Sequence, residues 1–147
     1  MGETVFVRIF DEAGDKVLMV LNKSKIMPDG KPKPKGFGLP GGGVRSNETP
    51  FQAIPRELKE ETGLEADINP EPLFSEVKRN GQTVILFEGK NPRGILKPLD
   101  QDIIMATFVP WRWLEYDKFT VKNPNDNISY PVYISHTKYI DQLLFCH

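Results

Sequence analysis

Three glutamates stand close together in one short segment, at Glu57, Glu60 and Glu61. In an α-helix, side chains three and four residues apart lie on the same face, so these carboxylates are expected to cluster. Like charges at this spacing cost roughly 0.2–0.5 kcal/mol per pair, and we expect Arg56 and Lys59 to point elsewhere. A hard divalent cation would turn the repulsion into attraction, and carboxylate oxygens suit magnesium or manganese. The spacing therefore favours a metal site over a solvated acidic face.

The residues around these carboxylates predict a helix with defined ends. Thr49 followed by Pro50 is typical of an N-cap and a first helical position, and Gly63 is typical of the residue that ends a helix. The stripe expected to face the core consists of Phe51, Ile54, Leu58 and Thr62. Pro55 interrupts the pattern, because a proline inside a helix costs about 3 kcal/mol. We therefore expect the first turn to be kinked or to begin late, which would alter how Glu57 is aimed.

A run of three glycines, Gly41 to Gly43, precedes this segment and would let the backbone approach a ligand closely. A phosphate-binding P-loop needs Gly-Lys-Ser/Thr after its glycines, and Gly43-Val44-Arg45 does not supply it. The run therefore excludes a nucleotide kinase or GTPase of that type.

Taken together, the segment resembles the full signature of the Nudix hydrolase superfamily. The matching positions are Gly42, Glu48, Arg56-Glu57-Leu58, Glu60-Glu61 and Gly63-Leu64. The resemblance implies an α/β/α sandwich with a mixed sheet between helices. It also implies metal-dependent hydrolysis of a phosphoanhydride and leaves the substrate open.

The resemblance also implies roles for individual residues. The catalytic set would be Arg56, Glu57, Glu60 and Glu61. The ligands of Mg²⁺ or Mn²⁺ would be Glu57, Glu60, Glu61 and the backbone carbonyl of Gly41. Glu48 would pair with Arg56 and fix the glycine turn against the helix.

A general base for the attacking water has several candidates. Glu57 could double in this role, whereas in many relatives the base is an acid on a later loop. In this chain the later candidates are Asp100, Asp102 and Glu88, in that order of preference. Each of them could equally be an ordinary loop or strand-end carboxylate.

Residues that could grip a substrate lie mostly outside this segment. The candidates for phosphate or base contacts are Arg8, Lys35, Phe37 and Trp111, with Phe87 and Trp113 behind them. Five lysines alternate with prolines between Lys23 and Lys35, just before the glycines. This stretch is either a solvated insertion or a cationic flap over the anionic part of a substrate. Most aromatic side chains in such positions belong to the core.

Composition bounds the class of protein. At 147 residues the chain is expected to be a single domain, residues 1–147, with one cysteine and a net charge of −1. This charge gives no general attraction to DNA or to an anionic membrane. No apolar run reaches transmembrane length and no signal segment is evident, so we expect a cytoplasmic protein. The sequence leaves monomer and homodimer open.

The remaining elements are predicted more coarsely. Val5–Phe10 and Val17–Leu21 are expected to form a hairpin in one mixed sheet, and Asn80-Gly81 a second hairpin with a two-residue turn. Ile95–Lys97 is expected to be a short strand and Ile103–Val109 the central one. A last helix is expected to begin after Ser135.

These features favour a metal-dependent hydrolase acting on a nucleoside diphosphate linked to another moiety. The alternative is a catalytically silent Nudix-fold module that binds or senses a nucleotide, which the intact glutamate set disfavours. An isomerase on the same fold would need a cysteine in the pocket, and Cys146 lies at the end of the chain. This third interpretation ranks last.

Overall fold

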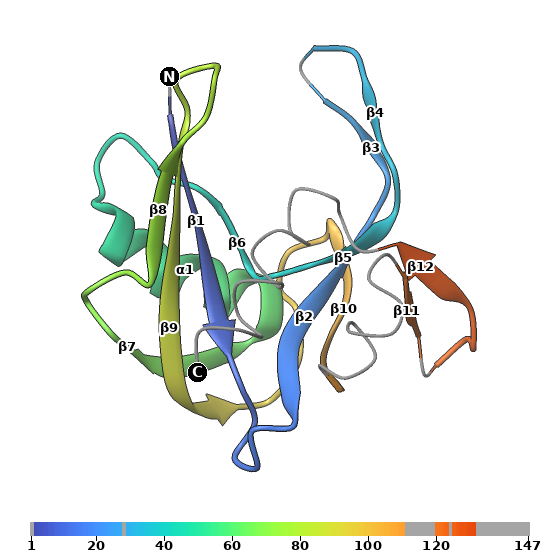
Figure 1. Ribbon diagram of the computed structural model, residues 1–147. Coiled ribbons are helices and arrows are strands. Elements are labelled where there is room, and N and C mark those ends of the chain that lie inside the picture. Colours follow the sequence, from blue (N-terminus) through green and yellow to red (C-terminus); the bar gives the residue numbers. More distant parts are fainter. Residues whose placement is uncertain (1, 28, 111–119, 124, 132–147) are drawn as a thin grey trace.

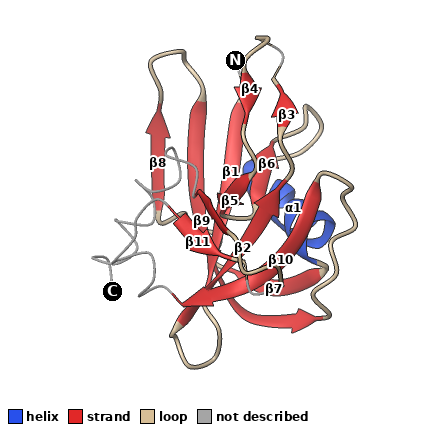
Figure 2. Ribbon diagram, turned by 90° about the vertical axis from the view of Figure 1, so that its right-hand side faces the viewer, coloured by secondary structure: helices blue, strands red, loops and turns tan. Residues whose placement is uncertain are grey.

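The computed structural model describes residues 2–27, 29–110, 120–123 and 125–131. Within these ranges the chain consists mostly of strands, with one helix, α1 (Pro50–Thr62). Figures 1 and 2 show this helix on one side of the larger sheet. The mixed α/β class with a mixed sheet is confirmed. The last helix, expected after Ser135, lies outside the described residues.

The larger sheet has five strands and combines parallel with antiparallel pairs. Its members are β1 (Glu3–Ile9), β6 (Gly41–Gly43), β7 (Leu64–Ile68), β8 (Phe74–Val77) and β9 (Thr83–Gly94). β1 pairs with β9 in parallel and with β6 antiparallel. The other edge of β9 pairs with β8 and then with β7. This arrangement places the glycine strand β6 beside β1, with Gly41 and Gly42 close to Glu61 and Glu57 of α1.

A three-stranded sheet and two short ribbons complete the described part. The sheet has the order β10–β2–β5, with β2 (Lys16–Asn22), β5 (Gly36–Gly38) and β10 (Ile103–Pro110). The ribbons are β3 (Lys25–Ile26) with β4 (Pro32–Lys33), and β11 (Thr120–Lys122) with β12 (Ser129–Pro131). Figure 1 shows the β3–β4 ribbon as an arm that projects from the rest of the chain.

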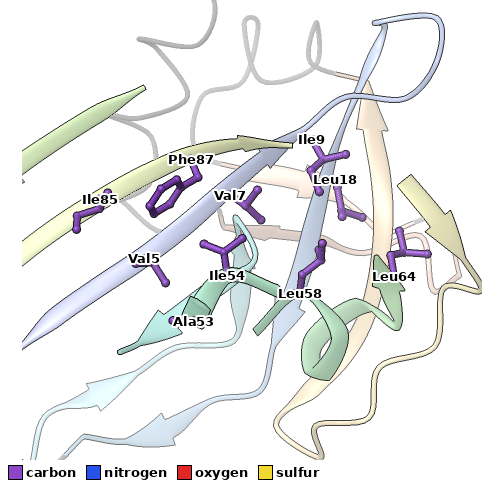
Figure 3. Packing of buried hydrophobic residues seen from close by; sticks show 10 residues of the cluster. All are labelled: Val5, Val7, Ile9, Leu18, Ala53, Ile54, Leu58, Leu64, Ile85 and Phe87. Carbon is purple, nitrogen blue, oxygen red and sulfur yellow. The ribbon is translucent and has the colours of Figure 1, made fainter. Parts of the chain in front are cut away.

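Apolar side chains bury both faces of the larger sheet. On one face, alternate residues of β1 and β9 pack against α1, as Figure 3 shows for Val7, Phe87 and Ile54. On the other face, Leu86 packs with Phe37 and other residues of the three-stranded sheet. The sheet is therefore a fixed platform for α1. Among the described residues, no helix combines the length and apolar character needed to cross a membrane.

Two expectations about the strands are wrong in their pairing. β1 and β2 belong to different sheets and are linked only where the chain turns, by a bridge between Phe10 and Val17 and a hydrogen bond from the Asp11 N–H to the Lys16 carbonyl. β10 is not central but pairs with β2 alone in its sheet, and its Ile104 is 40% exposed. An apolar run alone does not show which strands pair with it.

Two further local expectations also fail. The β8–β9 hairpin exists, but its turn is longer than two residues: the Lys78 N–H donates to the Gln82 carbonyl, and the Gly81 N–H to the Lys78 carbonyl. Residues 95–97 form no strand; instead the Lys97 N–H donates to the carbonyl of Thr62 at the end of α1. The chain after β9 is thereby tied to the helix and not to a sheet.

Candidate active site

The helix that carries the glutamates has the predicted ends. The hydroxyl of Thr49 accepts from the Gln52 N–H at 3.2 Å, and the Gln52 side chain accepts from the Thr49 N–H at 2.9 Å, which completes a capping box. Gly63 closes the helix with φ at 80°. The expected late start is wrong, because α1 runs without interruption from Pro50 through Pro55, which lies on its exposed side.

The apolar stripe of α1 differs from the predicted one at its first turn. Ile54, Leu58 and Thr62 are buried as expected, whereas Phe51 is 41% exposed and its ring lies 6.1 Å from that of Phe87. Two glutamates are buried beside the stripe, Glu57 and Glu61. The helix therefore holds carboxylates inside the protein, at the border of the core.

A cleft of about 270 Å³ opens beside these carboxylates. It is lined by Thr4, Phe6, Asn22, Lys25, Lys33, Leu39, Gly41, Gly42, Glu57, Glu61 and Asp100. These residues come from β1, β2, the β3–β4 ribbon, the glycine strand, α1 and the loop after β9. The cleft therefore joins acidic and basic side chains from segments that are far apart in the sequence.

Glu61 lies deepest among the glutamates, at 7% exposure. Its Oε1 accepts a hydrogen bond of 2.7 Å from the Gly41 N–H. Burial raises the pKa of Glu61 to about 8, against the lowering effect of that hydrogen bond, and Glu57, Asp100 and Glu60 raise it further. A negative charge at Glu61 is therefore costly until a cation approaches.

Glu57 lies beside the glycine strand and is 9% exposed. Burial raises its pKa, while Arg56 opposes the shift. A Cβ built on Gly42 would come within 2.6 Å of the Glu57 Oε1, so only glycine leaves room for this carboxylate. The predicted close approach of the glycine backbone is thus made to a protein carboxylate.

Arg56 was expected to point away from the acidic face of α1. Its side chain instead contacts the carboxylates on that face. Its Nη1 donates to Glu57 at 3.0 Å and to Glu60 at 3.4 Å, and its Nε donates to Glu48 at 3.1 Å. The hydrogen bond from Arg56 lowers the pKa of Glu48 to about 2, with help from the Arg45 N–H. The Glu48–Arg56 pair implied by the resemblance is present. Because the guanidinium is planar and forked, it can hold these carboxylates in fixed positions.

Two of the predicted metal ligands, Glu57 and Glu61, lie where they could hold a hard cation. Among the described residues, no three or more His, Cys, Asp and Glu side chains are gathered closely enough to hold a metal ion. Glu60 is engaged by Arg56 at 3.4 Å and by Arg45 at 3.7 Å. Glu57 and Glu61 nevertheless fit, because they are buried oxygen donors whose raised pKa values show a need for positive charge. Glu60 and the Gly41 carbonyl stay predictions as ligands.

Asp100 is the one base candidate on a later loop that lines the cleft. The N–H groups of Leu99 and Asp100 both donate to the Glu60 carbonyl at 2.8 Å, which fastens this loop to α1. Glu88 instead pairs with Arg8 at 3.4 Å and lines a different hollow. Asp102 is exposed and does not line the cleft. Of the three later candidates, only Asp100 therefore lines the cleft with Glu57 and Glu61, and its role as the base stays a prediction.

The predicted substrate contacts lie elsewhere. Arg8 is 3% exposed and Phe37 is fully buried in the core. The Lys35 Nζ donates to the Tyr130 hydroxyl at 3.1 Å. None of these three lines the cleft, and Trp111 lies outside the described residues. Their roles in binding stay predictions.

Lining residues that the sequence did not single out come from strands and from the ribbon. Thr4, Phe6 and Asn22 carry no signal of function, since strand residues like these are common in any sheet. Lys25 and Lys33 belong to the lysine-rich stretch for which a cationic flap was considered, but the preferred residue there was Lys35. The flap was considered because the lysine-rich stretch lies just before the glycines in the sequence. The folded ribbon shows that Lys25 and Lys33 are the lysines that line the cleft.

The sequence of this chain is similar to those of known proteins. A family model described as "NUDIX domain" matches residues 2–135. An RNA pyrophosphohydrolase of Hydrogenovibrio crunogenus is 37% identical over 73 residues, which cover 50% of this chain and 39% of that protein. The match thus spans less than half of the curated relative's length.

Solved structures show the same fold. A MutT chain, from work on Aliivibrio salmonicida and Vibrio cholerae, aligns with a TM-score of 0.72 at 16% identity and covers 99% of this chain and 98% of that one. The NUDIX domain of Shewanella oneidensis NrtR, complexed with ADP ribose, aligns with a TM-score of 0.70 at 18% identity, over 99% and 88% of the two chains. At these identities the likeness concerns the fold.

Proposed function

Because this chain belongs to the NUDIX domain family, we propose that it hydrolyses a phosphoanhydride bond with the help of Mg²⁺ or Mn²⁺. The substrate would be a nucleoside diphosphate linked to another moiety. The observation that carries this proposal is the cleft in which Glu57 and Glu61 are buried beside Asp100. Such a group of carboxylates has little value for stability and a clear use in binding cations.

Each residue of the cleft would have its own role in the proposed hydrolysis. Glu57 and Glu61 would hold the cation, with Glu60 and the Gly41 carbonyl as further donors. When bound, the cation would neutralise the phosphates and lower the pKa of a water molecule. Arg56 keeps Glu57 in place through its 3.0 Å contact, and Glu48 in turn holds Arg56. Water adds to one phosphorus, and the bond from that phosphorus to the bridging oxygen breaks.

Asp100 is the residue we assign to take the proton from the attacking water. We expect Asp100→Asn to lower kcat by about 100-fold with little change in KM, because general-base catalysis contributes about 10²–10⁴-fold. An asparagine Oδ1 can still accept the 2.8 Å bond from the Asp102 N–H, so the loop should keep its shape. Steady-state kinetics as a function of pH test this, with Asp102→Asn as the matched control. Equal losses in the two variants would contradict the assignment.

Gly42→Ala should alter the position of Glu57, and thus kcat, with little effect on the free energy of unfolding. The new methyl would displace the Glu57 carboxylate from the position in which Arg56 holds it. Because this carboxylate is the end of a side chain and not backbone, the free energy of unfolding should change by less than about 1 kcal/mol. We expect kcat to fall by about 10- to 100-fold, since small misplacements of a catalytic group have effects of this size. Kinetics and urea unfolding of the same preparations measure both. Gly43→Ala is the control, because its Cβ would meet nothing within 4 Å, and a similar loss of kcat there would argue against the proposed role of Glu57.

A panel of nucleotides tests the reaction itself. Candidates include nucleoside triphosphates, dinucleotides, ADP-ribose and triphosphorylated RNA, each with Mg²⁺ or Mn²⁺ and with a chelator. Hydrolysis that requires the cation supports the proposal, and products identified by ³¹P NMR give the bond that breaks. Tight binding without turnover would instead support the alternative of a silent nucleotide-binding module. Indifference of the protein to every nucleotide and both cations would exclude both.

A further inference from the structure

We propose that Lys25 and Lys33, on the β3–β4 ribbon, form a subsite for an additional phosphate group, so that the preferred substrates carry a chain of three or more phosphates. This inference rests on the proposed hydrolysis of a phosphoanhydride and extends it. It distinguishes nucleoside triphosphates and their derivatives from nucleotide sugars, in which the diphosphate ends in an uncharged ring.

The register of the ribbon places the two lysines opposite each other. β3 and β4 pair antiparallel with Lys25 against Lys33 and Ile26 against Pro32. Residues directly opposite in such a pair point to the same face, with Cβ atoms about 4.5–5.5 Å apart. Both lysines line the cleft. The cleft is therefore lined by two basic side chains from opposite positions of the ribbon.

The two positive charges of this pair favour an anion beside them. Like charges directly opposite each other destabilise a pair of strands. Burial of Lys33, and next the charge of Lys25, lower the pKa of Lys33, while Glu61 opposes the shift. A phosphate group beside the pair would reduce the repulsion between the lysines, since it can accept charge-assisted hydrogen bonds from both side chains.

The ribbon is held at its tip and at its base. At the tip, the Met27 N–H donates to the Lys31 carbonyl at 2.9 Å, and the Gly30 N–H to the Met27 carbonyl at 2.8 Å. At the base, the Lys35 Nζ lies 4.4 Å from the centre of the Tyr130 ring in addition to its contact with the hydroxyl. These contacts close the turn of the ribbon and tie the chain after β4 to Tyr130, so Lys25 lies opposite Lys33 before a ligand binds, and less ordering is needed on binding.

The charges of the cleft indicate where successive phosphates of a substrate would lie. Glu57, Glu61 and Asp100 repel a bare phosphate and accept one only through a cation. A diphosphate would therefore lie over α1, where the cation is expected. Lys25 and Lys33, from another segment, are placed for the next phosphate along the chain. A diphosphate that ends in a neutral sugar would bring no further negative charge to this pair.

Kinetics with two substrates of the same nucleoside test the proposal. The ratio of kcat/KM for the nucleoside triphosphate to that for the nucleotide sugar is compared in the wild type and in Lys25→Gln, Lys33→Gln and the double variant. We expect each single change to lower this ratio about tenfold, and Lys33→Arg to retain most of it. Lys31→Gln is the matched control: it removes the same charge from the same ribbon, at a residue that does not line the cleft. An unchanged ratio would overturn the inference, as would an equal loss on both substrates.

A binding measurement separates this inference from the proposed function. Calorimetric titration compares inorganic tripolyphosphate with pyrophosphate, in the presence of Mg²⁺. The wild type should bind tripolyphosphate more tightly, and the double variant should lose that preference while Lys31→Gln keeps it. If the wild type hydrolyses no nucleotide, the proposed function fails, but this titration still decides the inference. Equal affinity of the wild type for the two anions would overturn it.

Discussion

Glu61→Gln should abolish hydrolysis and yet stabilise the protein without metal. The amide is neutral and a weak ligand, so we expect kcat/KM to fall by about 1,000-fold, a loss typical of removing a group that stabilises transition-state charge. The fold should survive, because the amide oxygen of the introduced glutamine can still accept the 2.7 Å hydrogen bond that the Gly41 N–H donates to Glu61. Unchanged folding together with lost turnover would identify Glu61 as part of the reaction machinery.

The effect on stability follows from the pKa of Glu61, raised to about 8 from an ordinary value of 4.5. Because the folded protein holds this proton more tightly than the unfolded chain, the contribution of Glu61 to stability is full below pH 4.5. It is lost as the pH rises through about 8. Glutamine carries no charge at any pH, so the variant should match the wild type in acid and exceed it at alkaline pH, by about 2 kcal/mol.

Thermal unfolding with a chelator, from about pH 5 to pH 9, measures this difference. Added Mg²⁺ should raise the Tm of the wild type at alkaline pH, because a ligand that binds only the folded state stabilises it, and should leave the variant nearly unchanged. Glu65→Gln, an exposed carboxylate on β7, is the matched control and should show neither effect. A variant less stable than the wild type at pH 8 would contradict the burial argument, and full activity would contradict the metal site.

Gly63→Ala should cause a large loss of stability. Gly63 has φ at 80°, and a Cβ there would come within 2.5 Å of the Ile95 carbonyl oxygen and 2.7 Å of that of Lys97. Both atoms belong to the backbone and cannot turn aside as a side chain can. We therefore expect a decrease of about 3 kcal/mol or more in the free energy of unfolding.

Two controls separate the conformational cost from the collision. Gly14→Ala has a similar φ of 75° in open space and should cost about 1 kcal/mol, whereas Gly43→Ala should be close to neutral. Urea unfolding of the three variants gives the series. If Gly63→Ala cost no more than Gly14→Ala, the segment after β9 would have to move aside freely. The activity of Gly63→Ala gives a second test. The segment after β9 carries Asp100 toward the cleft, so its displacement should also lower kcat.

The helix of the site was predictable from the sequence because its determinants are local. Thr49 and Gly63 cap it through neighbouring backbone groups, and a period of 3.6 residues places Glu57 and Glu61 on one side. The late start expected from Pro55 does not occur, because packing of the apolar face of α1 against the sheet outweighs one missing backbone hydrogen bond. Arg56 also could not be placed, because a long side chain reaches carboxylates on both sides of its own position.

Strand pairing was only partly predictable, and so was the set of residues around the helix. Nothing local distinguishes Asp100 from Glu88, yet hydrogen bonds to the Glu60 carbonyl bring one to the cleft, while pairing with Arg8 holds the other in a different hollow. Likewise, cross-strand register selects Lys25 and Lys33 over Lys35. A capped helix with an acidic face could be deduced from the residues alone, and the spacing of its carboxylates indicated the kind of chemistry. Which acid and which lysines share the cleft could not, because contacts between distant segments depend on register and packing that no short stretch of residues contains.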